Sequence, residues 1–170
     1  SGQGTYSVNT TTGVITFTPV TGYTGTATPV TYSVTDSVGQ KASSTYTPTV
    51  VPAPTAVADT STGALNTAQS KDPLVNDTAG TGGTLDATTV RLCSGADVAP
   101  SCTATSKTIS GQGTYSVNTT SGVITFTPVT GYTGTATPVT YSVTDSVGQK
   151  ASSTYTPTVV PAPTAVADTS

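Results

Sequence analysis

Apolar and polar residues alternate along much of the second half of the chain, with the two-residue period of strands that bury one face. Tyr115 and Val117 alternate with polar neighbours, and Ile124 and Phe126 do the same on the far side of the sequence NTTSG. Asn, Ser and Gly are typical turn residues. The pattern therefore predicts a β-hairpin whose turn lies at residues 118–122.

A second hairpin is predicted farther along the chain. Its first strand carries Val139, Tyr141 and Val143 between Thr and Ser residues. The sequence DSVG at 145–148 places Asp first and Gly fourth, as in a type I turn. Apolar residues then lead to Val159 on the last strand. Shorter strands are predicted over residues 56–59, 90–93 and 102–107, and no segment shows the apolar period of an amphipathic helix.

The sequence of residues 1–61 recurs at residues 110–170 with one difference, Thr12 in the first copy and Ser121 in the second. Aligning Ser1 with Ser110 gives a period of 109 residues, which is the size of one domain. The sequence PAP, at 52–54 and 161–163, is expected to lie between units, because proline cannot join the middle of a sheet.

These boundaries predict three parts. Residues 1–50 are the C-terminal half of one unit, residues 51–159 are one complete unit, and residues 160–170 begin the next. About seven short strands in a unit of this length favour a β-sandwich. The predicted fold is therefore all-β, a tandem array of Ig-like β-sandwich modules.

The composition argues against most chemical functions. The chain has no His, Met or Trp, its eight acidic residues are all Asp, and its net charge is −3. Without His the usual general base and the commonest metal ligand are missing, so no enzyme is expected. Five Lys and Arg residues are too few for a nucleic-acid footprint. No apolar run is long enough to cross a bilayer, so no membrane insertion of this segment is expected.

The residues of the last repeat resemble a known family. The sequence GQGTYSVNTTSGVITFTPVTGYTGTATPVTYSVTDSVGQKASSTYTPTV (111–159) closely resembles the CshA-type fibril repeat of bacterial surface proteins, and residues 56–92 fit its first half. The chain is also similar to the wider class of bacterial cadherin-like and Ig-like adhesin modules. The most specific residues are Gly113, Phe126, Pro128, Gly131, Gly134, Tyr141, Asp145 and Gly148. The resemblance implies tandem β-sandwich modules in the stalk of a long, cell-wall-anchored adhesin, and it brings no catalytic residues.

The two cysteines, Cys93 and Cys102, enclose the polar sequence SGADVAPS between two predicted strands. An even pair of Cys in a surface protein favours a disulfide across the mouth of this loop. Two free thiols are the alternative. A metal site is disfavoured, because two Cys without any His are too few ligands.

No cofactor is expected, and calcium is the alternative. Asp59, Asp72, Asp77 and Asp86 lie in the loop-rich first half of the complete unit, and related adhesin modules hold calcium between domains with clustered Asp residues. Calcium requires six to eight oxygen ligands, and these aspartates are scattered singly along the sequence. Single Asp residues are typical of turns, where the side chain bonds nearby backbone, and we favour that interpretation.

Two further residue types have candidate roles. Tyr115, Tyr141 and Tyr155 are expected in the core, because the chain has no Trp and only two Phe. Tyr132 lies in a loop and is the candidate surface contact. Lys41, Lys71, Lys107 and Lys150 are candidates for an isopeptide crosslink, which requires a buried Lys, an Asn or Asp partner and a helper acid. Lys41 and Lys150 follow VGQ turns and are expected to face solvent, and no crosslink is expected.

Together these features predict a structural stalk repeat of a bacterial cell-surface fibrillar adhesin that projects a distal adhesive domain from the cell. The predicted location is extracellular, at the bacterial cell surface or cell wall. The predicted partners are neighbouring identical repeats, in the same or an adjacent chain, and a host or bacterial surface ligand bound through other domains. The alternative is a subunit of a self-assembling extracellular filament joined by head-to-tail strand complementation. A second alternative is a carbohydrate- or protein-binding Ig-like module.

Overall fold

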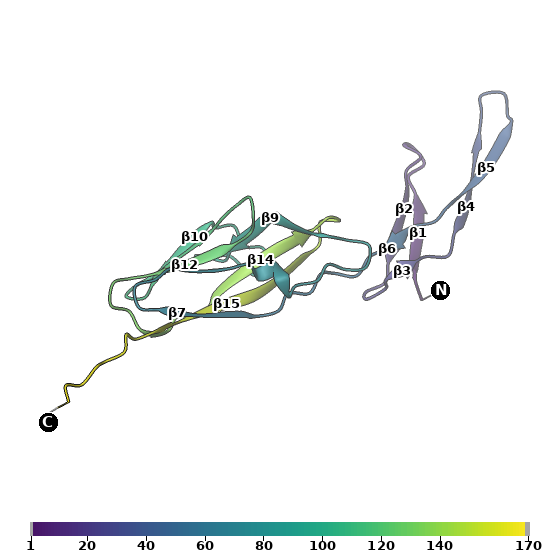
Figure 1. The fold of residues 1–170 in the computed structure, drawn as a ribbon. Helices are drawn as coiled ribbons and strands as arrows, with labels where there is room; N and C mark the ends of the chain where they lie inside the picture. Colours follow the sequence, from purple (N-terminus) through teal and green to yellow (C-terminus); the bar gives the residue numbers. More distant parts are fainter. Residues whose placement is uncertain (1, 169–170) are drawn as a thin grey trace. The chain divides into compact units, whose positions relative to one another are not determined.

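The computed structural model describes residues 2–168, which divide into two compact units, one ending at Pro52 and the other beginning at Ala53 (Figure 1). Both units are built from β-strands, which confirms the predicted all-β class. The helical structure in the described residues is a single 3₁₀ turn, η1 (Pro73–Val75). A helix with the length and hydropathy to cross a membrane does not occur within residues 2–168.

The unit that begins at Ala53 contains two sheets (Figure 1). The first is antiparallel, in the order β10 (Ser106–Ile109), β11 (Gly113–Val117), β12 (Ile124–Pro128), β8 (Gln69–Lys71). The second has antiparallel neighbours in the order β13 (Gly134–Thr135), β15 (Lys150–Val160), β14 (Val139–Asp145), β9 (Leu85–Leu92). One further strand, β7 (Asp59–Ala64), extends the second sheet by pairing with β15 in parallel.

The core lies between these two sheets and is built from the predicted alternating residues. Tyr115 and Phe126 of the first sheet and Tyr141 and Tyr155 of the second are fully buried in one apolar cluster. The ring of Tyr115 lies 4.7 Å from that of Phe126 and meets the ring of Tyr155, in the other sheet, edge-on at 6.0 Å. Aromatic pairs in this geometry add to the stability gained by burial. The unit is therefore a β-sandwich, and the three tyrosines expected in its core are confirmed there.

The second predicted hairpin also forms. The amide N–H of Gly148 donates to the carbonyl oxygen of Asp145 at 3.1 Å, which closes the turn between β14 and β15. The Asp145 side chain accepts from the N–H groups of Val147 and Gln149 at 3.0 and 2.8 Å. Asp therefore occupies the position where its carboxylate can satisfy the turn backbone.

The first half of this unit differs from the predicted strands. β7 begins at Asp59, where the predicted strand 56–59 ends, and β9 is longer than the predicted strand 90–93. β8 has no counterpart among the predicted strands. The sequences of β7 and β8, DTSTGA and QSK, contain no large apolar side chain. Their extended conformation therefore depends on pairing with β15 and β12.

The unit that ends at Pro52 consists of three antiparallel pairs. They are β1 (Gly4–Val8) with β2 (Ile15–Pro19), β3 (Gly25–Thr26) with β6 (Thr49–Val50), and β4 (Val30–Thr35) with β5 (Lys41–Tyr46). The β1–β2 and β4–β5 hairpins have the sequences of the β11–β12 and β14–β15 hairpins of the other unit. Counterparts of β7–β10 do not occur within residues 2–52.

The end of the described chain follows directly from the last strand. β15 continues to Val160, and residues 161–168 form no strand. The prediction that residues 160–170 begin a further unit stays a prediction, and residues 169 and 170 lie outside the described residues.

Candidate functional site

Cys93 and Cys102 form the predicted disulfide, and both are buried. The loop between them is also held by Asp97, whose carboxylate accepts hydrogen bonds from the backbone N–H groups of Ser94 (3.1 Å) and Thr103 (3.0 Å). These hydrogen bonds favour the charged carboxylate and lower the pKa of Asp97. Because the polar groups of this loop hydrogen-bond one another, the loop serves to stabilise the unit.

Two of the four aspartates that were considered for calcium bond the nearby backbone. Asp72 caps η1 by accepting a hydrogen bond from the N–H of Leu74 at 3.0 Å. Asp86 accepts from the hydroxyl and the N–H of Thr88, at 2.6 and 2.9 Å, and both hydrogen bonds lower its pKa. Within residues 2–168 no three acidic or cysteine side chains are arranged to hold a metal ion. Calcium binding stays a prediction.

The other two aspartates, Asp59 and Asp77, are buried, which the sequence pattern does not predict. The Oδ1 atom of Asp77 accepts a hydrogen bond from the N–H of Val57 at 2.7 Å. Its Oδ2 atom lies 2.9 Å from the hydroxyl oxygen of Tyr141, a core residue of β14. Asp77 therefore ties the segment before β7 to the centre of the second sheet.

The hydroxyl of Tyr141 has more acceptors than it can serve with one hydrogen. Besides Asp77, its oxygen lies 3.1 Å from the carbonyl oxygen of Val57. An ionised Asp77 would leave one of these acceptors without a proton. A protonated Asp77 satisfies all three groups, because it donates to Tyr141, which in turn donates to Val57.

The electrostatic surroundings agree with this arrangement. Burial is the largest influence on Asp77 and raises its pKa. The hydrogen bonds from Val57 and Tyr141 oppose that effect, whereas the negative charges of Asp59 and Asp72 add to it. Asp77 therefore keeps its proton to a higher pH than an exposed aspartate does.

Asp59 is the first residue of β7, opposite Tyr155 of β15. Its side chain is fully buried, and neither carboxylate oxygen has a hydrogen-bond partner among residues 2–168. The Nζ atom of Lys71, at the end of β8, lies 3.3 Å from Oδ1 of Asp59. We call Asp59, Lys71, Asp77 and Tyr141 the Asp59 cluster.

No sequence motif marks the Asp59 cluster. Asp59 and Tyr141 are far apart in the chain, and their approach depends on the pairing of β7 with β15 and of β15 with β14. Burial raises the pKa of Tyr141, and the charges of Asp77 and Asp59 contribute. The one sequence feature that could have indicated the cluster is Asp59 itself, a charged residue at the start of the otherwise uncharged segment DTSTGA.

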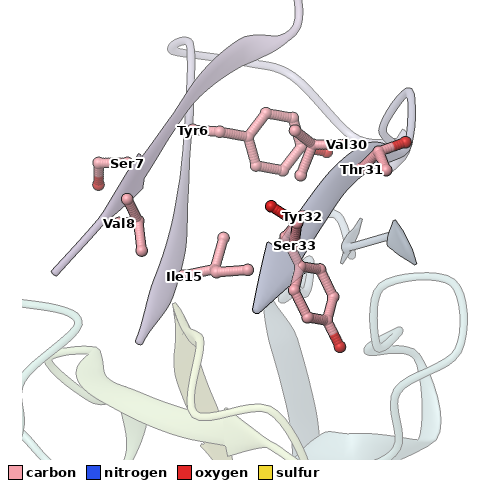
Figure 2. Close-up of a pocket in the computed structure, with 8 residues that line it drawn as sticks. All are labelled: Tyr6, Ser7, Val8, Ile15, Val30, Thr31, Tyr32 and Ser33. Atoms are coloured by element: carbon pink, nitrogen blue, oxygen red, sulfur yellow. The ribbon is translucent and has the colours of Figure 1, made fainter. Parts of the chain in front are cut away.

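A different feature occurs in the unit that ends at Pro52, where a pocket of about 350 Å³ lies between two hairpins (Figure 2). It is lined by Tyr6, Ser7, Val8, Ile15, Val30, Thr31, Tyr32 and Ser33. Tyr6 and Ile15 point into the space between the β1–β2 hairpin and β4 (Figure 2). Their counterparts in the other unit, Tyr115 and Ile124, are fully buried core residues. We call this pocket and its surroundings the open face.

The open face exposes residues whose counterparts lie in the core of the other unit. Val34 is 58% exposed, whereas Val143, at the same position of the repeat, is 0% exposed. In the other unit β9 pairs with β14, β10 with β11 and β8 with β12, so segments from residues 53–109 cover the identical residues. The lining of the pocket is therefore that of a core, and it has no charged group with which to fix a polar ligand.

Tyr132 lies in the loop after β12 and is half-buried. It packs against the edge of the core, with its ring 6.3 Å from that of Phe126 and nearly perpendicular to it. A large part of the ring is therefore engaged within the unit. The role of Tyr132 as a surface contact stays a prediction.

Comparison with known families adds one finding. The family model described as the surface adhesin CshA repetitive domain matches residues 1–50 and again residues 52–159. The first match and the end of the second, residues 110–159, are two copies of the repeated sequence. No curated protein matches the chain.

Proposed function

Because this chain belongs to the surface adhesin CshA repetitive domain family, we propose that it forms part of the stalk of a bacterial fibrillar adhesin and projects a distal adhesive domain from the cell. The family implies a location outside the cell or on its surface, and a structural role. The observation that carries the proposal is that the same adhesin family matches two consecutive stretches, and that residues 1–50 recur almost unchanged at residues 110–159 of the second. Repetition of one unit lengthens a stalk, whereas it adds nothing to a single active site.

The pairing of β7 with β15 supports a role under tension. These are the first and last strands of the unit, and they run in parallel from Asp59–Tyr155 to Ala64–Val160 (Figure 1). In a parallel pair the start of one strand and the end of the other lie at opposite ends of the ladder. Force applied through the chain on either side of the unit is therefore shared among all the hydrogen bonds of the pair at once, and does not break them one after another.

Small-angle X-ray scattering on arrays of increasing repeat number tests the proposal. We expect a rod whose length grows in proportion to the number of repeats, because each unit is a sandwich and the PAP sequence between units is stiff and extended. A radius that grows as in a compact globule, or as in a freely flexible chain, would contradict the stalk.

Strand addition between chains is a second candidate function. The same residues that are exposed in β4 are covered in β14 by segments from residues 53–109. We propose, as the alternative, a filament in which such a segment of one chain covers the open face of another by strand addition. In a stalk, the covering segment belongs to the same chain.

Light scattering of the 170-residue chain over a range of concentrations distinguishes the two. A filament subunit forms oligomers that grow with concentration and that Val34→Asp disrupts, because a charge on the open face prevents its burial. Val38→Asp, in the exposed turn after β4, is the matched control and leaves assembly unchanged. A mass that stays that of a monomer at all concentrations excludes the filament.

A further inference from the structure

The Asp59 cluster contains a buried charge that the fold does not otherwise satisfy. The Asp59 side chain is fully buried, and neither of its oxygens accepts a hydrogen bond from any group among residues 2–168. Burying an ionised carboxylate is costly, and an ion pair offsets the cost only when hydrogen bonds satisfy the remaining lone pairs. Buried polar groups without partners are rare in native proteins and require an explanation.

We propose that Asp59 and Lys71 react with each other to form an isopeptide bond inside the folded unit. The Nζ atom of Lys71 lies 3.3 Å from Oδ1 of Asp59, so the fold already holds the amine in contact with the carboxyl group whose carbon it would attack. The bond between Nζ of Lys71 and Cγ of Asp59 forms, one bond from Cγ to oxygen breaks, and a water molecule leaves. The ammonium and carboxylate of the pair contain every atom of the amide and the water, so no other reactant is consumed.

The reaction begins with a proton transfer within the pair. Transfer of a proton from the ammonium to the carboxylate produces an amine, which is nucleophilic, and a carboxylic acid, which is open to attack. Asp77, whose contacts with Tyr141 and Val57 fit its protonated form, is the acid close enough for the charge of Asp59 to act on it. Its proton assists the departing oxygen, and a proton from the attacking nitrogen restores it.

The bond has a structural consequence. Asp59 belongs to β7 in the second sheet, and Lys71 belongs to β8 in the first. The amide therefore joins the two sheets of the sandwich covalently and replaces the two charges of the pair by one neutral group. This consequence does not depend on the proposed stalk function.

Of the four lysines considered from the sequence, two lie in exposed turns and do not form such a pair. Lys41 and Lys150 are exposed, as expected from their turns. The Lys71 side chain is 31% exposed, and its amine meets a carboxylate that is 0% exposed. Lys71 has this position because β8 pairs with β12, which the sequence pattern does not predict.

Mass spectrometry of the intact chain, after reduction of the disulfide, tests the proposal. We expect a mass lower than that of the sequence by one water molecule. Trypsin should fail to cleave after Lys71, so residues 42–91 should appear as one peptide, also lighter by one water. The full sequence mass, with cleavage after Lys71, would show an ion pair and would overturn the proposal.

Three variants separate the crosslink from other losses of water. Lys71→Arg keeps the positive charge but removes the reactive amine, so the full mass should return; Lys107→Arg is the matched control and should keep the loss. Water loss that persists in Lys71→Arg identifies a cyclic imide at an aspartate and overturns the proposal.

Asp77→Asn keeps the hydrogen bonds of the protonated acid but cannot exchange a proton, so we expect most chains to stay uncrosslinked. Unchanged crosslinking in Asp77→Asn would exclude the assisting role of Asp77.

Discussion

At the scale of single residues, Asp77 shows how burial and hydrogen bonding together select a protonation state. Its contacts with Tyr141 and Val57 can all be satisfied only when the carboxyl carries a proton. Asp86, which is exposed and accepts two hydrogen bonds from Thr88, is selected for the opposite state. The two aspartates therefore make opposite contributions to the pH dependence of stability.

The raised pKa of Asp77 predicts the sign of its contribution to the pH dependence of stability. Above the ordinary aspartate pKa the unfolded chain has lost this proton while the folded unit keeps it, so the stabilising contribution is complete below that value and is lost as pH rises through the raised pKa. Asp77→Asn imitates the protonated form at every pH. We expect the stability of Asp77→Asn, measured by urea unfolding, to increase relative to the original protein as pH rises.

Asp86→Asn is the control, for which we expect a change of stability with pH in the opposite direction. The pKa of Asp86 is lowered, so its stabilising contribution is present above the ordinary aspartate pKa and is lost as pH falls through the lowered pKa. We expect this variant to lose stability relative to the original protein as pH rises. A change in the same direction for both variants would contradict the assigned protonation states.

Gly113 shows a steric requirement of one residue. A Cβ atom at this position would lie 2.4 Å from the carbonyl oxygen of Thr127 and 2.7 Å from the ring of Phe126. We expect Gly113→Ala to destabilise the unit by roughly 1–3 kcal/mol, as overpacked cores do, in urea unfolding monitored by tyrosine fluorescence. Gly2→Ala places its methyl group in open space and should change the unfolding midpoint little.

At the scale of elements, the strands divide by the origin of their stability. The β11–β12 and β14–β15 hairpins contain alternating apolar residues and turn sequences, and they form where the pattern predicts them. β7 and β8 contain no large apolar side chain, and partners that are distant in the chain hold them extended. The local pattern of apolar and polar residues does not predict strands of this second kind, because their extended state is favourable only when the partner strand is already in place.

The disulfide loop is the element whose removal is simplest to test. Cys93 and Cys102 are separated by 9 residues in the sequence. Replacing both by Ser should lower the free energy of unfolding by roughly 2–3 kcal/mol, because the open loop gains conformational freedom in the unfolded chain. Urea unfolding of the original protein with reductant should show a loss of the same size. An unchanged midpoint in both would indicate that other contacts hold the loop.

At the scale of the whole molecule, one sequence occurs in two surroundings. Tyr32 and Tyr141 occupy the same position of the repeat, yet Tyr32 is 38% exposed and Tyr141 is 0% exposed. Residues 53–109 account for the difference, because their strands pair with β11, β12 and β14. In the unit that begins at Ala53, residues 53–109 are therefore needed to bury the core.

A matched pair of variants measures this dependence. Val143→Ala removes two buried methyl groups and should cost roughly 2 kcal/mol of stability, including the cavity that is left. Val34→Ala makes the same change at the same position of the repeat, where the side chain is 58% exposed, and should cost much less. Hydrogen exchange followed separately in residues 2–52 and 53–168 measures the loss of stability caused by each substitution. Equal costs would show that the open face is covered in solution.

Local pattern was sufficient to predict the all-β class, the two hairpins, the tyrosine core and the disulfide, since alternation, turn residues and loop closure act over a few neighbouring residues. The parallel pairing of β7 with β15, the burial of Asp59 and Asp77, and the contact between Asp59 and Lys71 were decided by tertiary structure. These features join residues that are distant along the chain. Whether a charged or polar residue is buried there depends on which strand becomes its neighbour, and the residue's own sequence surroundings carry no information about that neighbour.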